Sequence, residues 1–156
     1  MLNFNKHGYL EPNKPINSSI AELERVFVIE YSSVERSKLF EEFLRCNKDL
    51  KSLCDNIELK QWVNGSFVSK FKKRPNDIDL VTFIDINIIK SLGEKIKPFV
   101  YPYSKKNYKG VDAYIVESNC DLYLYDKAYW HQQFDTTRRN SKTGKKLSKG
   151  FLEIIY

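Results

Sequence analysis

The feature that most constrains the fold is the stretch from residue 57 to residue 83, in which two strand-like segments flank a glycine turn and a basic segment. Residues 57–63 (IELKQWV) and 77–83 (DIDLVTF) are rich in the β-branched and aromatic side chains that favour strands. Alternate side chains of a strand point to opposite faces, so Asp77 and Asp79 share one face while the isoleucine and leucine that follow them point into a core. Two neighbouring carboxylates repel each other unless they face water or a cation. The stretch therefore predicts a core strand that begins with a carboxylate pair suited to a divalent cation.

Gly65 and Ser66 lie between the two segments, where the first strand is expected to give way to a short helix over residues 67–73. Pro75 disfavours helical backbone in the residue before it, so that helix is expected to stop there. Free backbone N–H groups at the start of a helix attract phosphate, and Ser66 as a helix N-cap fits the same arrangement. Mg²⁺ in proteins typically takes one or two carboxylates together with substrate phosphates. The combination predicts a site for phosphoryl or nucleotidyl transfer.

Gly-Ser followed by Asp-x-Asp at the start of a strand resembles the motif of the DNA polymerase beta-like nucleotidyltransferases. The short form is similar to the minimal nucleotidyltransferases of bacterial and phage defence and toxin–antitoxin systems. The resemblance implies two metal ions, Mg²⁺ or Mn²⁺, held by Asp77, Asp79 and a third carboxylate on a neighbouring strand. Asp112 is the first choice for the third position because it falls in the strand-like segment 111–116. Asp121 is the alternative, although a helix cap would explain it equally well.

Segments spread along nearly the whole chain resemble a second family, composed of small bacterial nucleotidyltransferase-like proteins that carry a domain-of-unknown-function label. This resemblance supports a fold more than a substrate. The segments are residues 4–12 (FNKHGYLEP), 74–79 (RPNDID), 111–114 (VDAY), 129–130 (YW) and 149–154 (KGFLEI).

Basic side chains predicted to contact a nucleoside triphosphate lie in two clusters, one between the halves of the motif and one in the segment 138–149, which is expected to be a mobile loop. For both clusters the alternative is an ordinary solvated basic surface. Lys105, in the basic loop expected over 104–110, is assigned to the surface. Tyr129 and Trp130 are assigned to the core, with base stacking as the alternative. The predicted nucleotide-binding set is Gly65, Ser66, Lys70, Arg74, Arg138 and Lys149.

The alternation of strand-like and helical segments predicts one α/β (α+β) domain over residues 1–156, with a small mixed sheet and helices mainly on one face. Residues 1–17 are expected to form an extended N-terminal arm. Asp85 is expected to be a turn residue or the N-cap of the next helix. The remaining expected elements are helices over 19–28, 34–53, 86–97 and 121–133, extended backbone over 100–103, and strands over 111–116 and 151–156.

Composition narrows the partners and the compartment. The net charge of +6 and the pI near 9.1 favour a polyanionic partner, which is a nucleotide, RNA, DNA or an acidic protein. The 3 cysteines show no pairing pattern, which indicates reduced thiols and a cytoplasmic protein. No segment is apolar and long enough to span a membrane, and no zinc-ligand spacing is present.

The sequence therefore predicts a metal-dependent nucleotidyltransferase that moves a nucleoside monophosphate from a nucleoside triphosphate to a macromolecular hydroxyl. The acceptor is RNA, such as a tRNA 3′ end, or a side chain of a partner protein, in a toxin–antitoxin or phage-defence setting. The main alternative is a catalytically inactive nucleotidyltransferase fold that acts as a binding module, either an antitoxin or an inhibitor. A further alternative is the sensing or synthesis of a small signalling nucleotide. The intact Gly65-Ser66 and Asp77-x-Asp79 argue against an inactive site.

Overall fold

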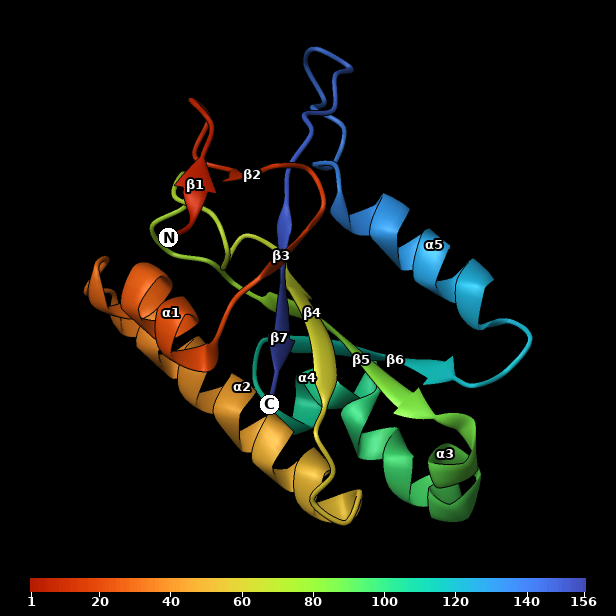
Figure 1. Ribbon diagram of the computed structural model, residues 1–156. Helices are drawn as coiled ribbons and strands as arrows, with labels where there is room; N and C mark the ends of the chain where they lie inside the picture. Colours follow the sequence, from red (N-terminus) through yellow and green to blue (C-terminus); the bar gives the residue numbers. More distant parts are fainter.

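The computed structural model describes residues 1–156 and centres on a five-stranded mixed sheet of order β3-β7-β4-β5-β6 (Figure 1). β5 runs parallel to β6 and β3 runs parallel to β7, whereas β4 is antiparallel to both β5 and β7. A separate two-stranded antiparallel sheet is formed by β1 and β2 near the N-terminus. The strands are β1 (Asn3–Phe4), β2 (Leu10–Glu11), β3 (Pro15–Asn17), β4 (Lys60–Asn64), β5 (Ile78–Asp85), β6 (Val111–Ser118) and β7 (Phe151–Ile155).

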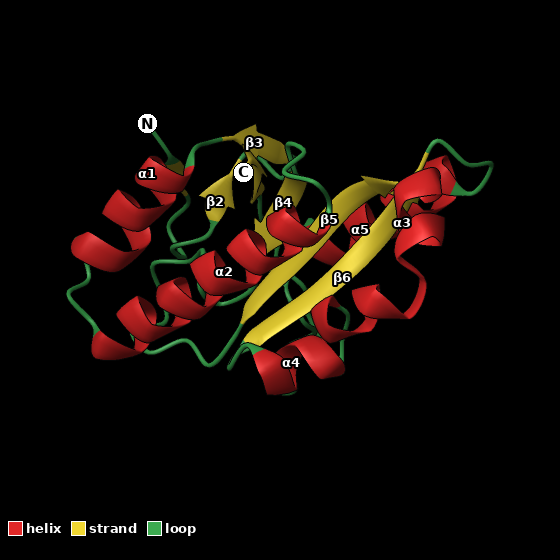
Figure 2. Cartoon of the chain, turned by 90° about the horizontal axis from the view of Figure 1, so that it is seen from below, coloured by secondary structure: helices red, strands yellow, loops and turns green.

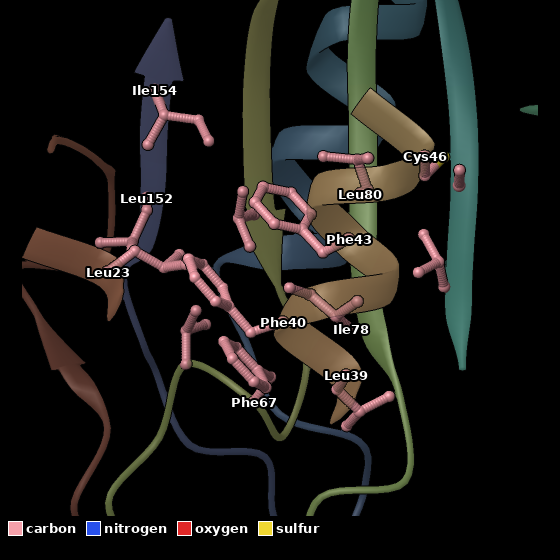
Figure 3. Close-up of a cluster of buried hydrophobic side chains, with 14 of the residues drawn as sticks. Leu23, Leu39, Phe40, Phe43, Cys46, Phe67, Ile78, Leu80, Leu152 and Ile154 are labelled. Carbon is pink, nitrogen blue, oxygen red and sulfur yellow. The ribbon is translucent and has the colours of Figure 1, made fainter. Parts of the chain in front are cut away.

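The long helix α2 (Val34–Leu53) packs across one face of the sheet and buries the larger of two cores (Figure 2). Its phenylalanines Phe40 and Phe43 point from the helix toward the strands, where they meet Leu80 and Leu152 (Figure 3). Helix α1 (Ile20–Glu24), which continues as a π-helical segment (Arg25–Ile29), contributes to the same core. Three shorter helical segments complete this part of the chain: α3 (Ile86–Leu92), a 3₁₀ helix (Gly93–Phe99) and α4 (Tyr103–Asn107).

Helix α5 (Tyr123–Phe134) covers the opposite face, over a smaller core built around Trp62 and Phe151. The predicted class, a mixed sheet with helices mainly on one face, is confirmed, and α5 is the helix that shields the second face. The expected N-terminal arm is partly built into the fold, because β3 pairs with β7 as an edge strand of the main sheet.

The helix expected over residues 67–73 is absent, and turns and bends replace it. Its carbonyls do not bond within the segment: those of Phe67, Ser69 and Lys72 accept hydrogen bonds from the guanidinium of Arg36. A buried cation on α2 therefore competes with the helix for the same acceptors. Without this helix, no helix dipole after Gly65 and Ser66 contributes to phosphate binding.

Two other expectations need correction. Residues 103–107 form helix α4, where extended backbone and a loop were expected, and the Ser104 hydroxyl anchors it by donating to the Val111 carbonyl and accepting from the Ala113 N–H. The helix after β5 was expected to end before Pro98, but a 3₁₀ segment carries the chain past this proline to Phe99. No helix of the chain combines the length and the apolar character that a membrane crossing requires.

Candidate active site

Three neighbouring strands bring polar side chains into one row at one end of the sheet. Asn64, the last residue of β4, pairs with Asp79, and Asp79 in turn pairs with Asp112 on the parallel strand β6. The next row on the same face contains Trp62, which belongs to the core under α5. Strand alternation therefore places this row on the α5 face, just beyond the edge of the apolar core.

The Asp79 carboxyl has an unfavourable electrostatic environment when it is ionised. Burial, reinforced by the negative charges of Asp77 and Asp112, raises the pKa of Asp79 to about 6, although Lys149 and Arg138 act in the opposite direction. An unusually high carboxyl pKa of this kind is typical of sites that accept a cation or a proton.

Gly65 lies directly against this carboxylate. Its φ of +88° is in the region that side-chain-bearing residues rarely adopt, and a Cβ built on it would lie 2.7 Å from Oδ2 of Asp79. Two polar atoms close by, Ser66 Oγ and Asp112 Oδ1, are buried without a hydrogen-bond partner. Buried polar atoms are normally satisfied, so both positions are suited to a ligand that brings its own partners.

Replacing Gly65 by alanine tests this close approach. We expect Gly65→Ala to lose about 1 kcal/mol or more of stability, because the backbone is strained and the methyl group displaces Asp79. Any stabilisation by Mg²⁺ plus a nucleoside triphosphate, measured by thermal unfolding, should also disappear. Gly93→Ala is the control, since Gly93 also has a positive φ (+52°) but nothing lies within 4 Å of its Cβ position. If both variants keep the same ligand response, the approach of Gly65 to Asp79 is irrelevant to binding.

The segment from Thr136 to Lys149 folds back on itself over the site and is called the basic hairpin below. A bridge joins Thr136 to Ser148, and the backbone N–H of Thr137 donates to the Leu147 carbonyl. The hairpin ends in Lys149, whose ammonium donates to Asn64 Oδ1 at 2.8 Å. Burial lowers the pKa of Lys149 to about 8, with Asp79 opposing the shift and Arg138 adding to it.

Two pockets meet at Asp79, and Thr137, Arg138 and Lys149 line both. The first, here called the loop-side pocket, has a volume of about 650 Å³ and adds Gly65, Ser66 and Asp77. The second, here called the helix-side pocket, has a volume of about 510 Å³ and adds residues of α5 and Tyr114. Two carboxylates, a tight backbone turn and four cationic side chains thus share the loop-side pocket, which is the composition expected of a triphosphate site.

The donor set fits a hard divalent cation in chemistry, because Asp77, Asp79 and Asp112 offer only oxygen ligands and one Asp112 oxygen has no partner. The other, Asp112 Oδ2, accepts from the ammonium of Lys105 at 3.0 Å. In this arrangement no group of three or more His, Cys, Asp or Glu side chains is close enough to hold a metal ion. The side chain of Lys105 is about half exposed, so it is free to turn away into solvent.

The structure brings together some of the predicted site residues and separates others. Gly65, Ser66, Asp77, Asp79, Arg138 and Lys149 line one pocket, and Asp112 adjoins Asp79 in register. Neither Lys70 nor Arg74 lines that pocket: the Lys70 ammonium lies 4.2 Å from the ring centroid of Phe4, and Arg74 pairs with Glu35. Asp121 is exposed and follows the far end of β6, which ends at Ser118.

Asp85 caps α3, accepting from the backbone N–H of Asn87, as the sequence predicts. Two polar neighbours of the carboxylates were missed, Asn64 and Lys105. Asn64 shares the strand alternation of Trp62 and so could have been placed on the carboxylate face. Lys105 had no such signal, because its position depends on the unexpected helix α4.

Comparison with known proteins identifies the family. The profile of a family of unknown function, DUF6932, matches residues 2–155. The chain belongs to DUF6932. No curated protein and no solved structure matches it. Because the description of DUF6932 names no activity, the function must be argued from the site itself.

Proposed function

We propose that this DUF6932 chain is a metal-dependent nucleotidyltransferase that moves a nucleoside monophosphate from a nucleoside triphosphate to a macromolecular hydroxyl. One observation carries the proposal: Asp79 and Asp112 are paired in register on adjacent strands, beside Asp77 and against the Gly65 turn. A buried Asp79 carboxylate with the negative charges of Asp77 and Asp112 nearby is costly unless a cation offsets them, which the raised pKa of Asp79 reflects. The acceptor is RNA or a partner protein, and a toxin–antitoxin or phage-defence setting in the cytoplasm fits such an activity.

Each residue of the site has a distinct part in this proposal. The three carboxylates hold Mg²⁺ or Mn²⁺, which when bound neutralises the triphosphate and lowers the pKa of the acceptor hydroxyl. The Gly65 turn and the Ser66 hydroxyl contact the terminal phosphates, and the cationic side chains of Arg138 and Lys149 offset their charge. Alignment and charge neutralisation provide most of the rate in such transfers, so no protein nucleophile is needed.

The direct test is incubation with each α-labelled nucleoside triphosphate, Mg²⁺ or Mn²⁺, and either total tRNA or cell lysate. We expect label in RNA or in a protein band with the wild type, and a loss of more than about 100-fold in Asp77→Ala/Asp79→Ala, since even removal of outer-shell partners of a metal costs 10–100-fold. Asp112→Asn should be similarly impaired, whereas Asp121→Asn should retain activity. The absence of transfer in every condition, together with no stabilisation by nucleotide, would refute the enzyme.

The same chemistry leaves one competing function, an inactive nucleotidyltransferase fold that binds a partner as an antitoxin or inhibitor. The ion pair between Lys105 and Asp112 favours it, because a side chain of the protein itself already neutralises the third carboxylate. Lys105→Ala separates the two functions. If Lys105 pairs with Asp112 only until a metal ion replaces it, nucleotidyl transfer should persist or rise in this variant. If the variant shows no transfer, the result supports the binding module.

A further inference from the structure

An aromatic stripe on the outer side of α5 is not explained by packing. Tyr125 and Tyr129 are 75% and 55% exposed, although tyrosines on an amphipathic helix usually turn toward the core. They are four residues apart and so lie one above the other on the helix, about 6 Å apart along its axis. Next to Tyr129, the ring of Trp130 packs on Tyr114 with 4.4 Å between centroids and is only partly covered.

The stripe leads toward the carboxylates. At the start of α5, Tyr123 contacts Phe83, near the far end of β5, with 6.2 Å between ring centroids. At its last residue, the Phe134 carbonyl accepts from Nδ2 of Asn64, in the same row as Asp79. Figure 1 shows α5 running back along the sheet in this direction, with the basic hairpin beyond its end. A molecule lying along the stripe therefore ends at the carboxylates.

The helix-side pocket joins the stripe to the basic hairpin. Tyr114, Tyr129 and Trp130 contribute aromatic surface, and the cationic lining comes from Arg138, Arg139, Lys146 and Lys149. Asp79 is the single acidic residue in this lining. Aromatic faces beside a positively charged groove are the combination by which proteins bind single-stranded nucleic acid.

We propose that the helix-side pocket and the aromatic stripe bind single-stranded RNA, with its 3′ end at Asp79 and Asp112. The inference rests on the proposed function, in which it selects RNA as the acceptor. Unpaired bases stack on Tyr129 and Tyr125, and the backbone phosphates face the basic hairpin. The amides of Gln132 and Gln133 and the hydroxyl of Thr136, which also line the pocket, provide partners for base edges and for the ribose 2′-hydroxyl.

The charge distribution favours RNA over a partner protein in this pocket. The lining carries four cationic side chains against one carboxylate, and the whole chain has a net charge of +6. A duplex fits less well, because its bases are already stacked on one another and offer no free face to the tyrosines.

Fluorescence anisotropy with a labelled single-stranded RNA, in EDTA and at two salt concentrations, tests the inference. Binding is measured on Asp77→Asn/Asp79→Asn as well as on the wild type, so that it does not depend on catalysis. We expect Tyr129→Ala and Tyr125→Ala each to weaken binding by about tenfold, since loss of one stacked base has an effect of this order. Tyr129→Phe keeps the stacking face and should bind like the wild type.

Tyr103→Ala is the matched control, because Tyr103 is 51% exposed on α4 and lines neither pocket. Arg139→Ala/Lys146→Ala should weaken binding and flatten its salt dependence. The inference is overturned if single-stranded RNA does not bind, if duplex RNA or single-stranded DNA binds as tightly, or if Tyr103→Ala weakens binding as much as Tyr129→Ala. Label transferred only to protein, with no RNA binding, overturns the inference while leaving the nucleotidyltransferase in place.

Discussion

Replacing Arg36 by methionine is expected to destabilise the protein by about 3–5 kcal/mol, because several backbone carbonyls lose the side chain that donates to them. Arg36 is 0% exposed and forms no ion pair. Its guanidinium instead donates to five backbone carbonyls, those of Phe27, Phe67, Ser69, Lys72 and Lys73. Methionine fills part of the space but satisfies none of these acceptors, and each buried carbonyl left without a donor costs about 1–3 kcal/mol.

The measurement is thermal and urea unfolding followed by circular dichroism, in which the midpoint temperature of Arg36→Met should fall by roughly 10 °C. Arg25→Met serves as the control, because Arg25 is half exposed and its ion pairs with Glu22 and Glu30 lie at the surface. Surface pairs contribute about 0–1 kcal/mol, so this variant should unfold near the wild-type temperature. Equal midpoints for the two variants would show that the loop carbonyls do not depend on Arg36.

Arg36 also links stability to the site. The loop that it holds, between Phe67 and Lys73, joins the Gly65 turn to Asp77, so a loosened loop moves both groups relative to Asp79. A variant that remains folded at low temperature should therefore bind Mg²⁺ and nucleotide less tightly than the wild type. The buried arginine thus positions the Gly65 turn and Asp77, a role that was expected of a short helix over residues 67–73.

The sequence predicted the parts of the site that follow from strand periodicity. Asp79 and Asp112 could be placed on strands from the apolar residues around them, and parallel strands with the same alternation bring such residues to one face. Gly65 could be anticipated because a strand that ends at a glycine is typical of a tight turn.

The missed features depend on contacts between residues far apart in the sequence. Arg36 is one of several cations on an amphipathic helix. No local pattern shows that it turns inward and donates hydrogen bonds to carbonyls 31 to 37 residues away. The basic residues near the motif illustrate the same limit. Lys70 and Arg74 are close to the carboxylates in sequence yet face Phe4 and Glu35, whereas Lys105 reaches Asp112. Proximity along the chain was thus a poor guide to which charges meet.

Asp79→Asn is expected to raise the stability of the protein without ligands and to abolish its response to metal and nucleotide. The folded-state pKa of Asp79, about 6, lies above its ordinary value of 3.8. Below the ordinary value the carboxyl is protonated in both states and contributes nothing. As pH rises from 3.8 to about 6, the unfolded chain loses this proton first, so the wild type becomes less stable across that window and remains so above it.

Asparagine does not titrate, so the unfolding temperatures of variant and wild type should coincide near pH 4 and separate by several degrees at pH 8, an effect on the order of 1–3 kcal/mol. With Mg²⁺ and a nucleoside triphosphate at pH 8, the wild type should instead unfold at the higher temperature, because the ligands should stabilise only the chain that keeps the Asp79 carboxylate. Asp121→Asn, at an exposed position, should follow the wild type in both conditions. If Asp79→Asn is instead less stable than the wild type at pH 8 without ligands, Lys149 and Arg138 already compensate the charge of the Asp79 carboxylate. A bound cation would then add little stability at this position.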